Sequence, residues 1–130
     1  MGEAVIAAGI GCRRGAGADD VSGAVEAALA AYGRDISLVG RFATSARKSA
    51  ETGIIAAASK LGLDVIAVAD EVLQAMAART LTRSKHSLGA TALPSLSEAA
   101  ALAAAGKEAR LLGPRVAFGG ATCALAEFTP

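Results

Sequence analysis

The sequence predicts an α/β protein with a mixed, mainly parallel sheet of about five strands, covered by helices on both faces. Short apolar runs rich in valine and isoleucine, such as 4–8 and 64–68, alternate with longer segments whose apolar residues recur at helical spacing. The connections are short, and parallel neighbouring strands need helical crossovers. Because 130 residues suffice for one hydrophobic core but not for two, we expect a single domain over residues 1–130.

The first half of the chain shows strands and helices in alternation. Asp19 and Asp20 favour a helix start because carboxylates complement the helix dipole, and Gly33 favours the end of that helix. Apolar residues at helical spacing after Glu51 predict a second helix, which ends at Gly62. The expected order is a strand at 4–8, a glycine-rich loop at 9–15, a helix at 19–33, a strand at 36–39, a polar loop at 40–50, a helix at 51–62 and a strand at 64–68.

The second half departs from this alternation. Asp70 is placed to cap a short helix after the third strand. Residues 78–94 are rich in basic and hydroxyl side chains, which predicts a mobile or ligand-facing segment with at most one short strand. Ser95 and Glu98 have the spacing of a capping box, in which each side chain binds a backbone N–H at the helix start. The alanine-rich helix that follows is expected to end near Ala105.

The last two expected strands lie at 111–112 and 121–128. The loop between them is short enough to make them antiparallel neighbours, since a parallel pair would need a longer crossover. The sheet is therefore expected to be mixed.

Composition and charge exclude several classes of protein. The chain has 13 Lys and Arg against 12 Asp and Glu, a net charge of +1, so no overall field attracts nucleic acid or an anionic membrane. Its three Phe and one Tyr do not lie among basic residues, as base stacking would require. Its apolar runs are too short to span a bilayer. Cys12 and Cys123 match neither a disulfide framework nor a zinc site, and we expect a cytoplasmic protein without metal or cofactor.

A segment after the first predicted strand combines glycines, a thiol and two cations: Gly9, Gly11, Cys12, Arg13, Arg14 and Gly15. Glycines allow backbone N–H groups to approach a ligand closely, and the arginines add positive charge, so the segment predicts an anion site. It is not the dinucleotide fingerprint, because Arg14 stands where the third glycine is required. Two alternatives remain open: a general nucleotide or phosphate site, and a tight turn with solvated arginines.

A second polar segment, from Thr44 to Glu51, follows the second predicted strand. Because the carboxyl ends of parallel strands meet at one edge of a sheet, this segment is expected near the glycine-rich loop. Arg13, Arg14 and Lys48 could then converge on one polyanionic ligand. The alternative is a capped helix with a surface pair of Lys48 and Glu51.

Candidate catalytic groups are few. Cys12 is a possible nucleophile beside two arginines, but the sequence shows no fixed base for it, and the single histidine, His86, has the flanking residues of a solvated loop. Cys123 lies in an apolar run and is interpreted as a core residue. Ser95 and Glu98 are explained more simply by helix capping than by ligand contact.

Together these motifs resemble the family formed by the CobE protein of cobalamin biosynthesis and the C-terminal domain of CbiG. The resemblance spans nearly the whole chain, and the order and spacing of its motifs are specific. The matching segments are 9–15, Thr44 with Lys48, Glu51 and Gly53, Ser95 with 98–100, and 121–122 with Ala124 and Ala126. The chain departs from the family pattern at Leu96, Ser97 and Cys123, and none of these departures touches the glycine, lysine or glutamate positions.

The resemblance implies a three-layer α/β/α sandwich that binds a precorrin-type tetrapyrrole on the route to vitamin B12. Such intermediates carry many carboxylates, which cations and backbone N–H groups can bind. The substrate-binding candidates are Gly9, Gly11, Cys12, Arg13, Arg14, Gly15, Thr44, Lys48, Glu51, Ser95 and Glu98.

The resemblance leaves the chemistry of the domain open. In this family the full CbiG protein opens a δ-lactone of a precorrin and releases acetaldehyde, with Cys12 and Glu51 as the catalytic candidates in this chain. The chain lacks the rest of CbiG, so we expect a carrier or accessory to the ring-contraction and deacylation steps. It is expected to work beside other cobalamin-pathway enzymes, with lactone hydrolysis and nucleotide binding as the alternatives.

Overall fold

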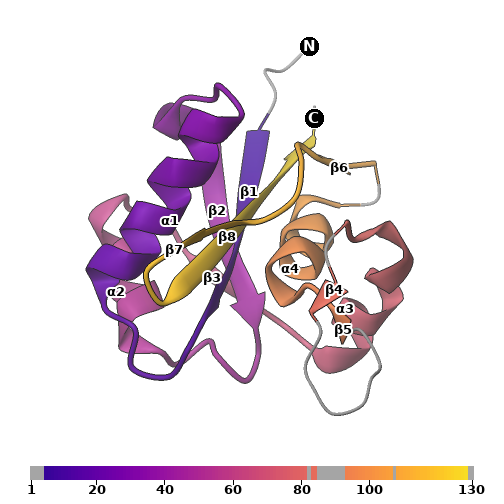
Figure 1. The fold of residues 1–130 in the computed structure, drawn as a ribbon, viewed down its shortest axis with the longest axis horizontal. Coiled ribbons are helices and arrows are strands. Elements are labelled where there is room, and N and C mark those ends of the chain that lie inside the picture. Colours follow the sequence, from indigo (N-terminus) through magenta and orange to yellow (C-terminus); the bar gives the residue numbers. More distant parts are fainter. Residues whose placement is uncertain (1–4, 82, 85–92, 107, 129–130) are drawn as a thin grey trace.

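The computed structural model describes residues 5–81, 83–84, 93–106 and 108–128. Strands and helices alternate in its first half, and strands dominate its end (Figure 1). The elements are β1 (Val5–Cys12), α1 (Ala18–Ala31), η1 (Ile36–Leu38), β2 (Val39–Ser45), α2 (Thr52–Lys60), β3 (Val65–Val68), α3 (Asp70–Ala75), η2 (Ala77–Arg79), β4 (Arg83–Ser84), β5 (Leu93–Pro94), α4 (Leu96–Ala105), β6 (Arg110–Leu111), β7 (Val116–Phe118) and β8 (Ala121–Phe128).

The main sheet is mixed, as the sequence predicts. Its order is β3-β2-β1-β8-β6, and β7 also pairs with β8. The strands β1, β2 and β3 are parallel, whereas β8 runs antiparallel to β1, β6 and β7. The last strand, β8, therefore lies inside the sheet, between β1 on one side and β6 and β7 on the other.

Helices cover both faces of this sheet, which confirms the three-layer arrangement. In Figure 1, α1 and α2 lie on one side of the strands, and α4 lies on the other with α3 beside it. No helix among the described residues has both the length and the apolar character needed to cross a membrane.

The two faces of the sheet differ in side-chain size. Alternate residues of β1 point to opposite faces. Ile6 and Ile10 join Phe42 in a core of large side chains under α1 and α2, whereas Ala7 packs among alanines under α4. At Gly9 the approach is so close that a Cβ would collide with the Ser97 carbonyl oxygen of α4. The alanine-rich composition thus allows α4 to lie almost against the strands.

Two strand boundaries predicted from the sequence are wrong. Residues 9–12 continue β1 instead of forming a loop, because they pair with residues 121–124 of β8. The second strand begins at Val39, where the sequence predicts its end. Residues 36–38 form a 3-10 turn instead, and the Asp35 carboxylate caps it by accepting a hydrogen bond of 2.9 Å from the Ser37 N–H.

Two further differences concern short strands. The segment at 78–94 was expected to hold at most one short strand, but β4 and β5 are two antiparallel strands of two residues each. The predicted loop between the last two strands contains β7, which pairs with β8. His86 lies outside the described residues. The antiparallel pairing expected between 111–112 and 121–128 is confirmed, with β6 spanning Arg110–Leu111.

Candidate functional site

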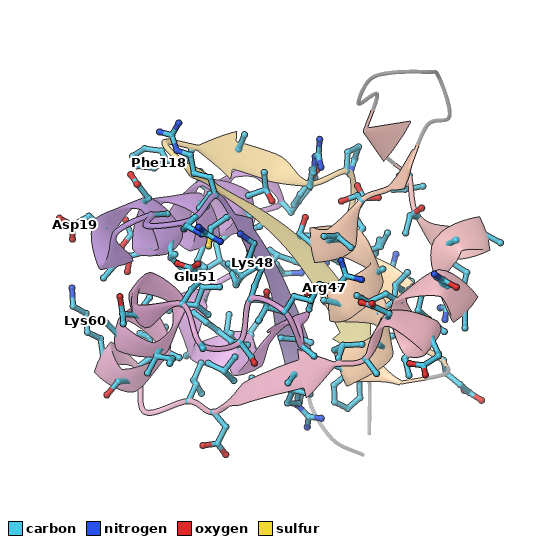
Figure 2. All side chains as sticks on the ribbon, turned by 90° about the horizontal axis from the view of Figure 1, so that it is seen from below. Asp19, Arg47, Lys48, Glu51, Lys60 and Phe118 are labelled. Atoms are coloured by element: carbon cyan, nitrogen blue, oxygen red, sulfur yellow. The ribbon has the colours of Figure 1, made fainter. Side chains whose placement is uncertain are left out.

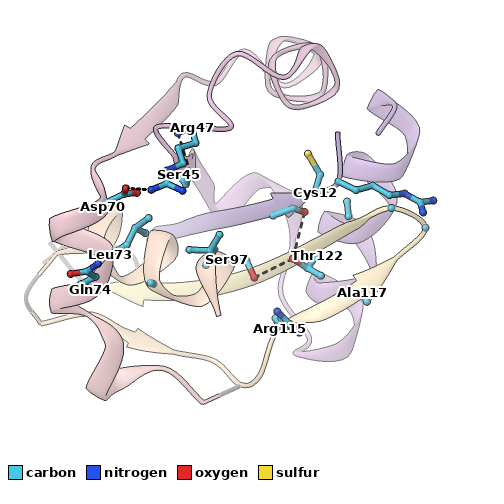
Figure 3. A pocket seen from close by; sticks show the side chains of 17 residues that line it. Cys12, Ser45, Arg47, Asp70, Leu73, Gln74, Ser97, Arg115, Ala117 and Thr122 are labelled. Carbon is cyan, nitrogen blue, oxygen red and sulfur yellow. Dashed lines mark hydrogen bonds and ion pairs between the residues drawn. The ribbon is translucent and has the colours of Figure 1, made fainter. Parts of the chain in front are cut away.

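A pocket of about 660 Å³ opens at the carboxyl edge of the parallel strands (Figure 3). Its walls come from the ends of β1 and β2, the first turns of α3 and α4, and the segment from Arg115 to Thr122. This edge is where open α/β sheets bind ligands, and the volume lies in the range typical of small-molecule and cofactor sites.

Three arginines line the pocket, each from a different connection. Arg13 follows β1, Arg47 follows β2, and Arg115 precedes β7. Arg47 forms an ion pair of 2.6 Å with Asp70, which is the carboxylate among the pocket-lining residues. The lining therefore carries more positive than negative charge, and it can receive an anion with several separated carboxylates.

The floor of the pocket carries hydroxyl groups. The Ser97 Oγ lies 3.3 Å from the Thr122 Oγ1 and 3.2 Å from the Ser95 Oγ, and the Thr122 hydroxyl lies 3.5 Å from the carbonyl oxygen of Gly11. Ser95 and Ser97 are buried. Apolar groups complete the lining, among them the side chain of Leu73. The pocket thus combines an apolar interior with a few placed polar groups, as ligand sites do.

Glu98 is fully buried and holds two segments beside α4. Its Oε2 accepts a hydrogen bond of 2.9 Å from the Arg115 N–H, and its Oε1 accepts one of 2.6 Å from the Leu81 N–H. The serine half of the predicted capping box is confirmed, since the Ser95 Oγ accepts from the Glu98 N–H at 3.3 Å. The Glu98 carboxylate thereby fixes the backbone at Arg115, one of the three pocket arginines.

Only part of the predicted set of site residues reaches the pocket. Gly11, Cys12 and Arg13 line it. The other candidates lie outside its lining: Gly9, Arg14, Gly15, Thr44, Lys48, Glu51, Ser95 and Glu98. Arg14 is exposed in the turn after β1 and, unlike Arg13, does not line the pocket.

Gly9 and Thr44 have structural explanations. Gly9 lies inside β1, where its missing side chain admits α4 rather than a ligand. Thr44 is buried, and its hydroxyl donates a hydrogen bond of 2.7 Å to the carbonyl oxygen of Ile10. This bond ties β2 to β1 just below the edge of the sheet. Residues 9–12 pair with β8 as part of a strand, while Gly11 and Cys12 also line the pocket.

Lys48 and Glu51 lie near Cys12, which lines the pocket, and Figure 2 shows Lys48 and Glu51 close together just before α2. Glu51 Oε1 accepts a hydrogen bond of 3.1 Å from the Gly15 N–H. Burial raises the pKa of the Cys12 thiol above its ordinary value, the Glu51 carboxylate raises it further, and Lys48 lowers it. At neutral pH the thiol is therefore protonated, which does not favour a nucleophilic role.

The sequence reasoning missed two of the three pocket arginines. Arg47 lies next to Lys48 in the polar segment from Thr44 to Glu51. The sequence indicated this segment as part of a site, but Lys48 and not Arg47 was predicted to contact the ligand. No local sequence pattern predicts that Arg115 lines the pocket, because its position depends on β7 and on the hydrogen bond from its N–H to Glu98. Both positions depend on contacts between distant parts of the chain.

The fold and the pocket define an α/β/α domain with a cationic binding site at the carboxyl ends of its parallel strands. The chain belongs to the cobalamin synthesis G C-terminus family, whose model matches residues 6–126. It is thus a member of the CbiG and CobE group of cobalamin biosynthesis proteins.

Solved structures agree with this family. The cobalamin biosynthesis protein chiG from Agrobacterium tumefaciens is 48% identical, with a TM-score of 0.74 over 94% of this chain and 97% of that one. CobE, a protein from the cobalamin (vitamin B12) biosynthetic pathway, is 34% identical, with a TM-score of 0.87 over 98% of this chain and 94% of that one. No curated protein sequence matches the chain at a significant level.

A cobalamin biosynthesis protein G homolog from Sulfolobus solfataricus shares the fold at 18% identity, with a TM-score of 0.68. The match covers 95% of this chain and 37% of that one. In that larger protein the fold accounts for only part of the length.

Proposed function

We propose that this domain binds a precorrin-type tetrapyrrole in the pocket at the carboxyl edge and carries or presents it to other cobalamin-pathway enzymes. The observation that carries the proposal is that Arg13, Arg47 and Arg115, from three different connections, line one largely apolar pocket. A corrin precursor combines an apolar ring with carboxylates around its rim, which matches that distribution of groups.

The environments of Cys12 and Glu51, the two catalytic candidates, favour a carrier over a lactone hydrolase. The Cys12 thiol has a raised pKa, and the Glu51 carboxylate accepts a hydrogen bond from the Gly15 N–H, away from the pocket lining. Cys12 lines the pocket but its raised pKa disfavours the nucleophilic thiolate, and Glu51 is not among the lining residues. A nucleotide site is disfavoured because Gly9 and Gly11 of the expected glycine-rich loop pair within the sheet.

The first experiment is a titration of the purified protein with precorrin intermediates and, separately, with ATP and NAD. Tetrapyrrole absorbance reports binding, and product analysis reports any reaction. A spectral change without a new product supports carriage. Ring opening that disappears in a Glu51→Gln variant would instead establish the hydrolase, and binding of nucleotides alone would overturn the proposal.

Matched variants then locate the site. Single changes of Arg13, Arg47 or Arg115 to alanine should each weaken tetrapyrrole binding by about tenfold, because each removes charge-assisted hydrogen bonds to a carboxylate. Arg14→Ala is the control, since it removes the same charge one residue from Arg13 but outside the pocket lining. Equal losses in the Arg13 and Arg14 variants would show that general charge, and not the pocket, attracts the ligand.

A further inference from the structure

Among the pocket arginines, Arg47 is the one that forms an ion pair within the described part of the chain. Its Nη2 lies 2.6 Å from the Oδ2 of Asp70, and both residues line the pocket. The two come from different connections: Arg47 lies in the turn after β2, and Asp70 is the first residue of α3. Figure 3 shows the pair at one end of the pocket, with Arg115 on another side.

The backbone holds both partners in place. The Arg47 N–H donates a hydrogen bond of 3.1 Å to the Ser45 Oγ, and the N–H of Ala46 donates one of 2.8 Å to the Val68 carbonyl oxygen. The first bond fixes the turn after β2 locally, and the second ties this turn to the end of β3, directly before α3. The position of the Arg47 backbone relative to Asp70 is thereby set by the sheet.

The pair is open to water. The exposed fraction is 78% for the Arg47 side chain and 45% for the Asp70 side chain. Exposed ion pairs contribute little to stability, because both charges are well solvated when they separate. A carboxylate that arrives in the pocket can therefore take the place of Asp70 on Arg47 at small cost.

The exchange is selective, because Asp70 repels every carboxylate that approaches Arg47. A small ligand with few carboxylates gains too little from this one site to replace Asp70. A polycarboxylate that is also bound by Arg13 and Arg115 is held next to Arg47 and competes at high local concentration. The pocket then discriminates between ligands through repulsion by Asp70 as well as through attraction by the arginines.

We infer that Asp70 is a specificity-determining residue, which occupies Arg47 until a carboxylate of a polycarboxylate ligand replaces it. The inference rests on the proposed function, because it assigns one carboxylate subsite within the same pocket. Asp70→Asn removes the competing charge and keeps the size of the side chain. Glu71→Gln is the matched control, since Glu71 is the next residue of α3, is exposed, and lies outside the pocket lining.

The probes are uroporphyrin, a tetrapyrrole polycarboxylate followed by fluorescence, and citrate, a small polycarboxylate followed by calorimetry. Asp70→Asn should bind uroporphyrin about threefold to tenfold more tightly than the unchanged protein, and its relative gain for citrate should be larger. Glu71→Gln should change either affinity by less than about twofold. In an Arg47→Ala background, Asp70→Asn should lose most of its effect.

Weaker binding in Asp70→Asn, or a change equal to that in Glu71→Gln, would overturn the inference. Failure of every variant to bind uroporphyrin while citrate binding still responds to Asp70→Asn would contradict the proposed tetrapyrrole function and leave the carboxylate subsite standing. The two proposals therefore fail in different ways.

Discussion

The side chain of Arg13 lies against the α-carbon of Gly120. A Cβ at Gly120 would come within 2.7 Å of the Arg13 Nε and 3.3 Å of its Cγ, and the Arg13 N–H donates a hydrogen bond of 3.0 Å to the Gly120 carbonyl oxygen. The turn between β7 and β8 thus packs against Arg13 at the rim of the pocket, where both Arg13 and Gly120 are lining residues.

Gly120→Ala should displace the Arg13 side chain and weaken tetrapyrrole binding by about fivefold to tenfold, a loss close to that of Arg13→Ala. Gly17→Ala is the control, because a Cβ there has no atom within 4 Å. Binding measurements on the single and double variants test the relationship. If the two losses multiply in the double variant, Gly120 acts independently of Arg13.

Gly9→Ala should destabilise the fold by about 3 kcal/mol or more, because the new Cβ overlaps backbone atoms of α4 that cannot move alone. Gly11→Ala should cost less, since the atom that its Cβ approaches, at 2.8 Å, is the side-chain hydroxyl of Thr122. Urea unfolding measures both changes. Equal midpoints for Gly9→Ala and the unchanged protein would contradict the close contact between β1 and α4.

Glu98→Ala should destabilise the protein by about 3 kcal/mol, because it leaves the N–H groups of Leu81 and Arg115 without the carboxylate that binds them. Glu98→Gln should cost less, as its amide oxygen can still accept one bond. Glu108→Ala, a change at an exposed position, serves as the control in the same unfolding experiment. A neutral effect of Glu98→Ala would refute the assigned role.

The Cys12 thiol should react slowly with iodoacetamide at neutral pH and faster as the pH rises, because burial raises its pKa and the thiolate is the reactive form. Glu51→Gln removes a group that raises this pKa and should speed the reaction, whereas Lys48→Met should slow it.

Cys123 is buried with its pKa also raised, so its alkylation should require unfolding. Mass spectrometry of the labelled peptides distinguishes the two thiols. Rapid labelling of Cys12 at neutral pH would reopen its nucleophilic role.

Local signals in the sequence were sufficient to place α1, α2, α3 and α4, although Asp70 is the first residue of α3 and does not cap it. Gly33 and Gly62 adopt positive φ angles of 63° and 71° just after α1 and α2, which glycine accommodates without steric strain. The serine cap of α4 and the parallel order of the first three strands were also predictable, because each depends on residues close together in the chain.

Non-local contacts account for the errors. The glycines at 9 and 11 suggested a loop, but β8 extends β1 through them by pairing residues more than a hundred positions away. The position of Arg115 depends on its hydrogen bond to Glu98 and on the strand β7, and no local sequence pattern predicts either of them. Arg14 and Lys48 were predicted from their charge, their polar segments and the family resemblance, and none of these reveals on which side of a turn a residue lies.

The central position of β8 has a consequence for how the domain folds. Val5 pairs with Phe128 and Cys12 with Ala121, so the middle of the sheet joins opposite ends of the described chain. Contacts of such high sequence separation slow folding, because the intervening chain must be ordered before they form. During synthesis on the ribosome, one edge of β1 would stay unpaired until β8 had emerged. The floor of the pocket at Thr122 would be among the last parts of the molecule to be completed.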